Sequence, residues 1–198
     1  VSRILEFAGE PTAITRLVRA LTYRNRDART GEFFGNTARS HLVALIKVLQ
    51  TRVPGLWGWR DLYHVATHYD LHRRVLKNSR HGRAKAAAIV RKTFAGVVNT
   101  VESWLGEYEG AFACWDRSPP FPLDAFLRGS GVLVLTVPED QADSLSPAAR
   151  TVLRAAKDRL LADTGRDPES RPTVVLDELA DLEECVKAVT PLFGRGGR

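Results

Sequence analysis

The sequence predicts a mainly α-helical protein, in which an antiparallel helical bundle precedes a partial α/β segment with about two parallel strands. Apolar residues recur at helical spacing through most of residues 1–116. Three prolines between positions 119 and 122 interrupt that pattern. Beyond them, two short apolar runs flank a helical stretch, which is the order of a βαβ unit. We therefore expect an all-α domain over 1–116 and a second domain over 117–198.

The helical pattern of the first half predicts four helices. The first covers about 11–21, the second ends before Pro54, the third takes Asp61 as its N-cap, and the fourth runs about five turns after a break at 78–82. Their expected buried faces are, in order, Ile14, Leu17, Val18 and Leu21; Ala38, Leu42, Leu45, Ile46 and Leu49; Leu62, Val65, Ala66 and Tyr69; and Ala86, Val90, Phe94, Val97, Val98, Val101, Trp104 and Leu105.

In the second half, the runs 132–137 and 173–176 are apolar on both faces, as are strands of a covered parallel sheet. Between them, Ser146-Pro147 is an N-cap and first-turn pair that opens a helix. Its inward residues are expected to be Val152, Leu153, Ala156 and Leu160.

Length and composition set limits on the class of protein. The chain has 198 residues, 44% of them hydrophobic, which is enough for one large or two small folded domains and too many for a disordered chain. No apolar stretch approaches 18 residues, and the N-terminus has no signal-peptide pattern. The two cysteines form no disulfide framework or metal motif, which favours a reducing compartment. Methionine is absent even at position 1, so we expect a piece of a longer protein.

Charge divides the chain into two parts. The formal net charge of +6 combines 18 Lys and Arg against 6 Asp and Glu in residues 1–100 with 11 against 17 in residues 101–198. An asymmetry of this size indicates two modules with different partners, and a basic module is suited to nucleic acid.

The basic residues concentrate where acidic residues are missing. No Asp or Glu lies between Asp70 and Glu102. The cations in that interval are Arg73, Arg74, Lys77, Arg80, Arg83, Lys85, Arg91 and Lys92. Asn78 and Ser79 add hydrogen-bonding groups that suit phosphate. The segment is a surface that binds the DNA backbone, a solvated helical face, or a surface that pairs with the acidic second half.

Two further groups each have a functional and a structural interpretation. His64, His68 and His72 fall at i, i+4 and i+8, so they would share a helical face and could ligate a metal, although polar-face or interface histidines are the commoner case. Trp57 and Trp59 are expected to anchor the core rather than to stack on bases.

A chemical motif stands at the end of the second apolar run. Asp177 and Glu178 follow Val174-Val175-Leu176 directly, which places two carboxylates at the C-terminal edge of a buried strand. In the Walker B arrangement of P-loop ATPases, such an Asp holds Mg²⁺ and such a Glu orients the attacking water. The alternative is that the two acids merely end a strand. No glycine is followed by lysine, so the phosphate-binding Walker A loop is absent and we expect no ATP hydrolysis by this chain alone.

The order of these features resembles the type IV secretion coupling proteins, the hexameric ATPases of conjugative DNA transfer. Four passages carry the resemblance: Glu32-Phe33-Phe34 leading into Ala38–Leu49, Phe121–Leu127 with Gly131–Leu135, Val174–Ala180, and Phe193–Gly197. The first is similar to the start of that family's all-α domain, and the second to the return into its nucleotide-binding domain. The third is similar to Walker B, and the fourth to a Gly-Arg-x-x-Gly stretch.

The resemblance implies separate roles for the two domains. The helical domain would recognise substrate, meaning relaxase-bound DNA or a secreted protein, on the cytoplasmic side of the bacterial inner membrane. Asp177 would serve Mg²⁺ and ATP, Glu178 the hydrolytic water, and Arg195 would approach the nucleotide. The transmembrane helices and Walker A of the hexameric parent would precede this chain. Asp181 to Glu184 depart from the family's more compact ending after Walker B.

A different class of protein fits the same residues. The chain could be a helical DNA-binding or adaptor protein with a small α/β appendage and no ATPase ancestry. A Walker A motif and two apolar spans in the upstream sequence would favour the coupling ATPase, and their absence would favour the adaptor. The sequence leaves open whether the cargo is DNA or protein, and whether the fragment oligomerises.

Overall fold

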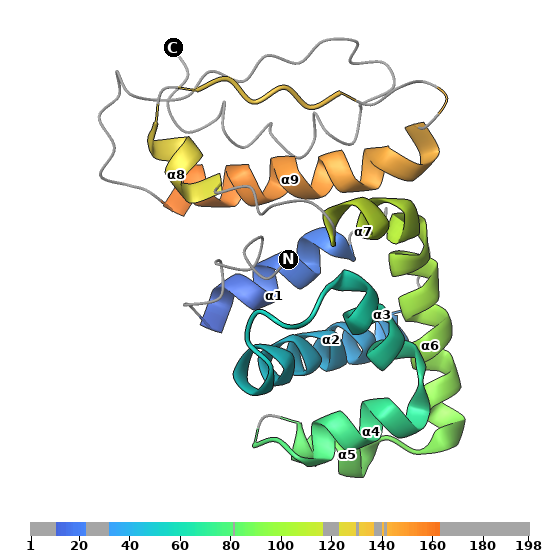
Figure 1. The fold of residues 1–198 in the computed structure, drawn as a ribbon. Coiled ribbons are helices and arrows are strands. Elements are labelled where there is room, and N and C mark those ends of the chain that lie inside the picture. Colours follow the sequence, from blue (N-terminus) through green and yellow to red (C-terminus); the bar gives the residue numbers. More distant parts are fainter. Residues whose placement is uncertain are drawn as a thin grey trace. The chain divides into compact units, whose positions relative to one another are not determined.

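The computed structural model describes residues 11–22, 32–80, 82–116, 123–129, 131–136, 140 and 142–162 (Figure 1). Within these ranges the regular elements are helices, so the prediction of a mainly helical protein is confirmed for them. The chain divides into two compact units, Val1–Phe121 and Pro122–Arg198. The first unit contains α1 (Pro11–Leu21), α2 (Glu32–Arg52), α3 (Trp59–Thr67), α4 (Tyr69–Lys77), α5 (Arg83–Ala88), α6 (Arg91–Leu105), a 3₁₀ turn (Gly106–Tyr108) and α7 (Glu109–Trp115).

Helix α2 is the central helix of the first unit, because it packs against α1, α3, α4 and α6. Its apolar stripe is buried as predicted, and Leu45 and Ile46 are fully inaccessible to solvent. Burial of a side chain of this size contributes about 1.5–3 kcal/mol. The same stripe also includes His41, which is 5% exposed. The core of α2 therefore contains a buried titratable group beside its apolar residues.

Arg39 of α2 ties the end of α1 to the core. Its Nε donates to Oγ1 of Thr22 over 2.9 Å and its Nη2 donates to the Thr22 carbonyl over 3.2 Å. The guanidinium also lies 4.9 Å from the ring centroid of Trp104 on α6. A cation at a helix C-terminus satisfies carbonyls that the helix leaves unpaired. Arg39 thus joins α1, α2 and α6 in one set of contacts.

Two carboxylates accept hydrogen bonds from the backbone N–H groups at the N-terminus of α3. Gly58 is the N-cap, and its N–H donates to Oδ2 of Asp61 over 2.7 Å. The carboxylate of Asp116, which directly follows α7, accepts from the Trp59 N–H at 2.8 Å and the Arg60 N–H at 3.1 Å. The predicted N-cap role of Asp61 is therefore wrong, because Asp61 lies three residues inside the helix and reaches back to the cap. A Cβ on Gly58 would lie 2.6 Å from Oδ1 of Asp116, so this closure requires glycine.

An aromatic cluster fills the contact between α3 and α7. The rings of Trp59 and Phe112 stack with centroids 5.4 Å apart, and Trp115 packs on Trp59 at 5.9 Å. Tyr108 also stacks on Phe112, with centroids 5.6 Å apart. Trp57 and Trp59 are 4% and 2% exposed, which confirms that both tryptophans are core residues.

The long fourth helix of the prediction is divided in two. Helix α5 ends at Ala88 and α6 begins at Arg91, with Ile89 and Val90 extended between them. Ile89 is buried, whereas Val90 is 55% exposed and is the N-cap of α6. The Val90 N–H donates to Oγ1 of Thr93 instead of continuing a helical ladder. Two adjacent β-branched residues favour this break, since such residues fit extended backbone well.

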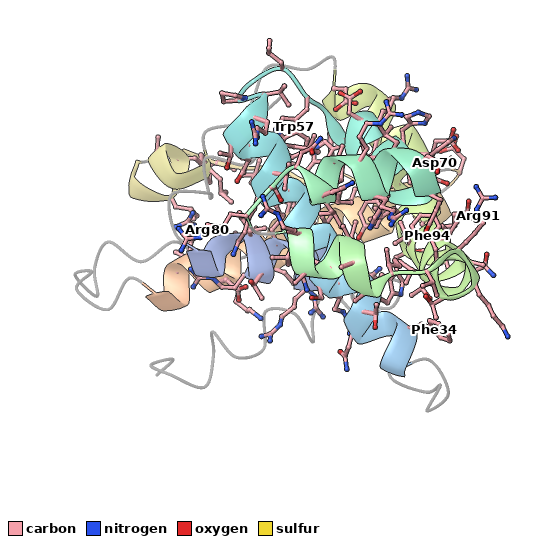
Figure 2. All side chains as sticks on the ribbon, turned by 90° about the horizontal axis from the view of Figure 1, so that it is seen from below. Phe34, Trp57, Asp70, Arg80, Arg91 and Phe94 are labelled. Atoms are coloured by element: carbon pink, nitrogen blue, oxygen red, sulfur yellow. The ribbon has the colours of Figure 1, made fainter. Side chains whose placement is uncertain are left out.

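The packing of α6 differs from that of an antiparallel bundle neighbour. Figure 1 shows α6 running across the direction of α2, and Figure 2, viewed from below, shows α6 nearly end-on. Helices α4 and α5 form a tight pair joined by the predicted break at 78–82, and α6 follows this pair. The structure therefore shows a crossing of α6 and α2, and it does not show the antiparallel bundle expected from the short connections.

In the second unit, α8 (Leu123–Arg128) packs against α9 (Ala142–Ala162). The predicted helix is present, but α9 begins four residues before the expected Ser146-Pro147 start. Among the residues of α9 whose burial is described, Ala148 and Thr151 are buried, while the four predicted inward residues, Val152, Leu153, Ala156 and Leu160, are half-buried.

The first predicted strand is not shown among the described residues. Residues 131–136 have no strand assignment, and Val132 and Val134 are 89% and 75% exposed. An apolar run becomes a buried strand only when a neighbouring strand takes its backbone hydrogen bonds. Among the described residues, none pairs with this run. The second predicted strand, 173–176, lies outside the described residues.

None of the helices in the described ranges combines the length and apolar content that crossing a membrane requires.

Candidate nucleic-acid interface

The eight predicted cations lie on α4, on the turn after it, on α5 and on the first turn of α6. They are Arg73, Arg74 and Lys77; Arg80; Arg83 and Lys85; and Arg91 and Lys92, and we call this set the basic layer. All except Lys85 are exposed. Figure 2 shows Arg80 and Arg91 at opposite ends of the α4–α5 pair, so the charge is spread along the surface rather than gathered at one point.

Lys85 is the member of the basic layer that turns inward. It is half-buried, and its Nζ donates to Oγ of Ser40 on α2. This contact holds α5 against the central helix. Lys85 therefore supports the layer and is less able than its neighbours to reach a ligand.

Arg91 is in contact with the one acidic residue of α4. Its Nη2 lies 3.8 Å from Oδ2 of Asp70, and both side chains are 79% exposed. The guanidinium also lies 5.4 Å from the ring centroid of Tyr69. An ion pair this exposed contributes about 0–1 kcal/mol, so a phosphate can displace the carboxylate at little cost.

The structure adds Arg52 to the predicted residues. This exposed side chain at the end of α2 donates from Nη2 to the Asn78 carbonyl over 2.7 Å. That contact places its cation beside the α4–α5 turn. Arg52 lies 21 residues before Arg73 in sequence, so only the packing of α2 on α4 could reveal it.

The turn between α4 and α5 is built by Ser79. Its Oγ donates to the Leu76 carbonyl over 3.1 Å and accepts from the Gly82 N–H over 2.8 Å. Ser79 is 8% exposed. The expectation that Ser79 offers its hydroxyl to phosphate is therefore wrong, because the hydroxyl is buried and used within the turn. Gly82 is required here, since an added Cβ would lie 2.7 Å from Cδ2 of Leu76.

Beneath the basic layer lies a buried histidine pair that the sequence analysis missed. A hydrogen bond of 2.8 Å joins Nδ1 of His41 on α2 to Nε2 of His72 on α4. Burial lowers the pKa of both rings to about 4, and the positive charge of Lys85 adds to the effect on His41. The backbone of Ala66 and Val65 acts in the opposite direction on the pKa of His72. Both rings are thus neutral at neutral pH and carry no charge into the layer.

The expected row of three histidines is broken. The backbone leaves the helical conformation at His68, with φ −103° and ψ 109°, which ends α3 and begins α4. His72 consequently turns inward to His41 and is 1% exposed. His64 and His68 stay exposed, with ring centroids 3.9 Å apart. Within the described ranges, no group of three or more His, Cys, Asp or Glu could hold a metal ion.

The three residues assigned to nucleotide and magnesium chemistry, Asp177, Glu178 and Arg195, lie outside the described residues. Their geometry therefore takes no part in the site described here.

Comparison with protein-family models, with curated proteins and with solved structures finds no match to this chain. The likeness to coupling proteins accordingly rests on the sequence passages alone.

Proposed function

We propose that the basic layer binds nucleic acid through the phosphate backbone, and that the helical unit is a substrate-binding module. The observation that supports this most directly is the exposure of seven cations on consecutive elements, from Arg73 to Lys92. Their nearest acidic residue on α4, Asp70, is held only by an exposed ion pair. A layer of this kind attracts a polyanion more strongly than it attracts any single carboxylate.

The chemistry of the layer favours binding without base readout. Arg and Lys contacts to phosphate fix position on the nucleic acid and carry no sequence information. Each phosphate contact releases condensed counterions, so affinity should fall steeply as salt rises. Helix α5 is only six residues long, which offers little surface for a groove-reading helix.

A finer form of the proposal assigns the chain to a coupling ATPase of conjugative DNA transfer. In that form the substrate is relaxase-bound DNA or a secreted protein, and the parent is a membrane-anchored hexamer. The rest of the chain would supply a RecA-like segment with parallel strands, in which Asp177 serves Mg²⁺ and ATP, Glu178 the water and Arg195 the nucleotide. The support is the sequence order of the four passages, together with the basic charge of the helical domain that the first passage opens.

The second candidate is a helical DNA-binding or adaptor protein without ATPase ancestry. The exposure of Val132 and Val134 favours it, because a RecA-like segment needs a buried strand at this point. Both candidates share the basic layer, so binding to nucleic acid tests what they have in common.

The test is fluorescence anisotropy with labelled single- and double-stranded DNA between low and physiological salt. We expect binding at low salt that weakens steeply with salt. The variant R80E/R83E reverses two exposed charges at the α4–α5 turn and should bind at least about tenfold more weakly. Lys85 is left unchanged because its contact with Ser40 supports α5.

The matched control is R60E, which reverses an exposed arginine on α3, outside the basic layer. It should change affinity far less than R80E/R83E. No salt-sensitive binding to either DNA at low salt would remove the proposal and leave a protein cargo as the explanation of the basic layer. R60E reverses one charge and R80E/R83E reverses two, so a loss of binding free energy in R60E about half that in R80E/R83E would show that net charge, rather than this surface, governs binding.

A further inference from the structure

The uncharged exposed residues of α5 and of its junction with α6 have short side chains. They are Ala84, Ala87, Ala88 and Val90. In the chain, cations of the basic layer come directly before and after them, at Arg83 and at Arg91. Short side chains do not hold a ligand away from neighbouring cations. A phosphate backbone that lies on α5 can therefore reach the exposed cations on both sides of these residues.

The one large aromatic ring of the basic layer is already in use. Tyr69 is the single Tyr, Trp or Phe between positions 69 and 93. Its ring is half-buried, and it meets the ring of Phe94 edge-on with centroids 5.2 Å apart. The guanidinium of Arg91 lies 5.4 Å from the same ring. Proteins that bind single-stranded nucleic acid stack its bases on exposed aromatic rings, and Tyr69 is occupied by these two neighbours instead.

The two imidazoles just before α4 are engaged with each other. The ring centroids of His64 and His68 are 3.9 Å apart, which is the separation of packed rings. Nδ1 of His68 also lies 2.9 Å from the His64 carbonyl oxygen. A base that stacked between these rings would have to separate them. We therefore expect little contribution of base stacking to binding at the basic layer.

Binding by charge alone favours the polymer of higher charge density. Each neutralised phosphate contributes a salt slope of about −0.9 for duplex DNA and about −0.7 for a single strand. If the seven exposed cations neutralise about five phosphates, the slopes are about −4.5 and −3.5, and the duplex is favoured about tenfold at 0.1 M salt. We propose that the substrate class of the basic layer is double-stranded DNA. This inference rests on the proposed function, namely that the layer binds nucleic acid.

The experiment compares a labelled duplex of mixed sequence with its two separated strands and with oligothymidine of the same length. Anisotropy with the whole chain is measured across a range of salt concentrations. We expect the duplex to bind about tenfold more tightly at 0.1 M salt, with a preference that grows as salt falls. Absence of salt-sensitive binding to either polymer would remove the proposed function itself. Equal binding, or tighter binding of the single strands, would overturn this inference and leave the proposed function standing.

Three variants test the reason for the preference. A87W adds an exposed ring to α5, so single strands should bind about fivefold more tightly while duplex affinity stays within about twofold. The matched control N99W places the same ring at an exposed, uncharged position of α6, about two turns beyond Lys92, and should change neither affinity. H64A should also change neither affinity.

Two results with these variants would overturn the inference. An unchanged single-strand affinity in A87W would show that α5 does not lie against the nucleic acid. A loss of single-strand affinity alone in H64A would show that bases do stack on the histidine rings. Neither result would affect the proposed function, because both require that the chain binds DNA.

Discussion

Helices α3 and α4 are each nine residues long and are separated by His68 alone, yet they have opposite roles. Helix α3 is held at its start by two carboxylates and at its buried face by aromatic stacking. Helix α4 buries His72 and Leu76 and turns its arginines to solvent. If the basic layer binds nucleic acid as proposed, these consecutive helices of equal length serve stability and binding respectively.

This difference predicts which property a substitution on each helix should change. Most contacts of α3 are made inside the protein, so changes there should alter the free energy of unfolding. The exposed cations of α4 make few contacts inside the protein, so changes there should alter affinity for a polyanion and leave the fold intact. The predictions below test this division, beginning with the largest effect.

Replacing Trp59 with alanine should lower the free energy of unfolding by about 3–5 kcal/mol. The indole is 2% exposed and packs against both Phe112 and Trp115, so the change leaves a cavity where α3 meets α7. Urea denaturation measures the loss. The control on α4, R73A, should change stability by no more than about 0.5 kcal/mol. A similar loss in both variants would contradict the division between the two helices.

Acidification should destabilise the protein through the histidine pair under α4. The pKa of both His41 and His72 is lowered to about 4 in the folded chain, against an ordinary value of 6.5. The unfolded chain therefore binds protons first, so stability is full above pH 6.5 and is lost as pH falls toward 4. Between pH 6.5 and 5 we expect the two groups together to cost about 3 kcal/mol of stability.

The pH prediction is checked by urea unfolding at closely spaced pH values. The variant H41L/H72L replaces the neutral buried pair with apolar groups, and its stability should lose most of this pH dependence above pH 5. An unchanged slope in that variant would assign the acid sensitivity to other groups.

The smallest effects come from two carboxylates: Asp116, which follows α7 and accepts from the start of α3, and Asp70 on α4. Changing Asp116 to asparagine weakens the closure of α3 and should lower the free energy of unfolding by about 1 kcal/mol, without altering DNA affinity. Changing the exposed Asp70 to asparagine should leave stability within about 0.5 kcal/mol and raise DNA affinity slightly, because Arg91 loses its carboxylate partner. Urea denaturation and DNA-binding anisotropy on both variants measure these two effects. A loss of stability in D70N with none in D116N would contradict the prediction.

Local patterns in the sequence were enough to predict several elements. Helical spacing of apolar residues predicted α1 and α2, and the polar stretch 78–82 predicted the turn between α4 and α5. The buried tryptophans followed from their size and surroundings. These features depend on residues within a few turns of one another, which is why a sequence reveals them.

The errors arose where distant residues compete with local ones. Asp61 was predicted to be an N-cap because no local pattern indicates the contact of Asp116 with the same helix end. Asp116 lies 57 residues after Trp59 in sequence. His72 looked like a member of a surface row because its partner, His41, is on another helix. The run at 131–136 looked like a strand because its composition suits one, but composition supplies no hydrogen-bonding neighbour.

By itself, the sequence determined the helical character, the uneven charge and the interval of cations between Asp70 and Glu102. Periodicity and charge are properties of single segments. On every helix the hydrophobic effect favours burial of the apolar residues and leaves the charged ones in water. Tertiary structure alone decided that α3 ends at His68, that His72 meets His41, and that Arg52 joins the α4–α5 turn. Those outcomes depend on which helices pack together, since burial and hydrogen bonding between distant residues outweigh the preferences of any one segment.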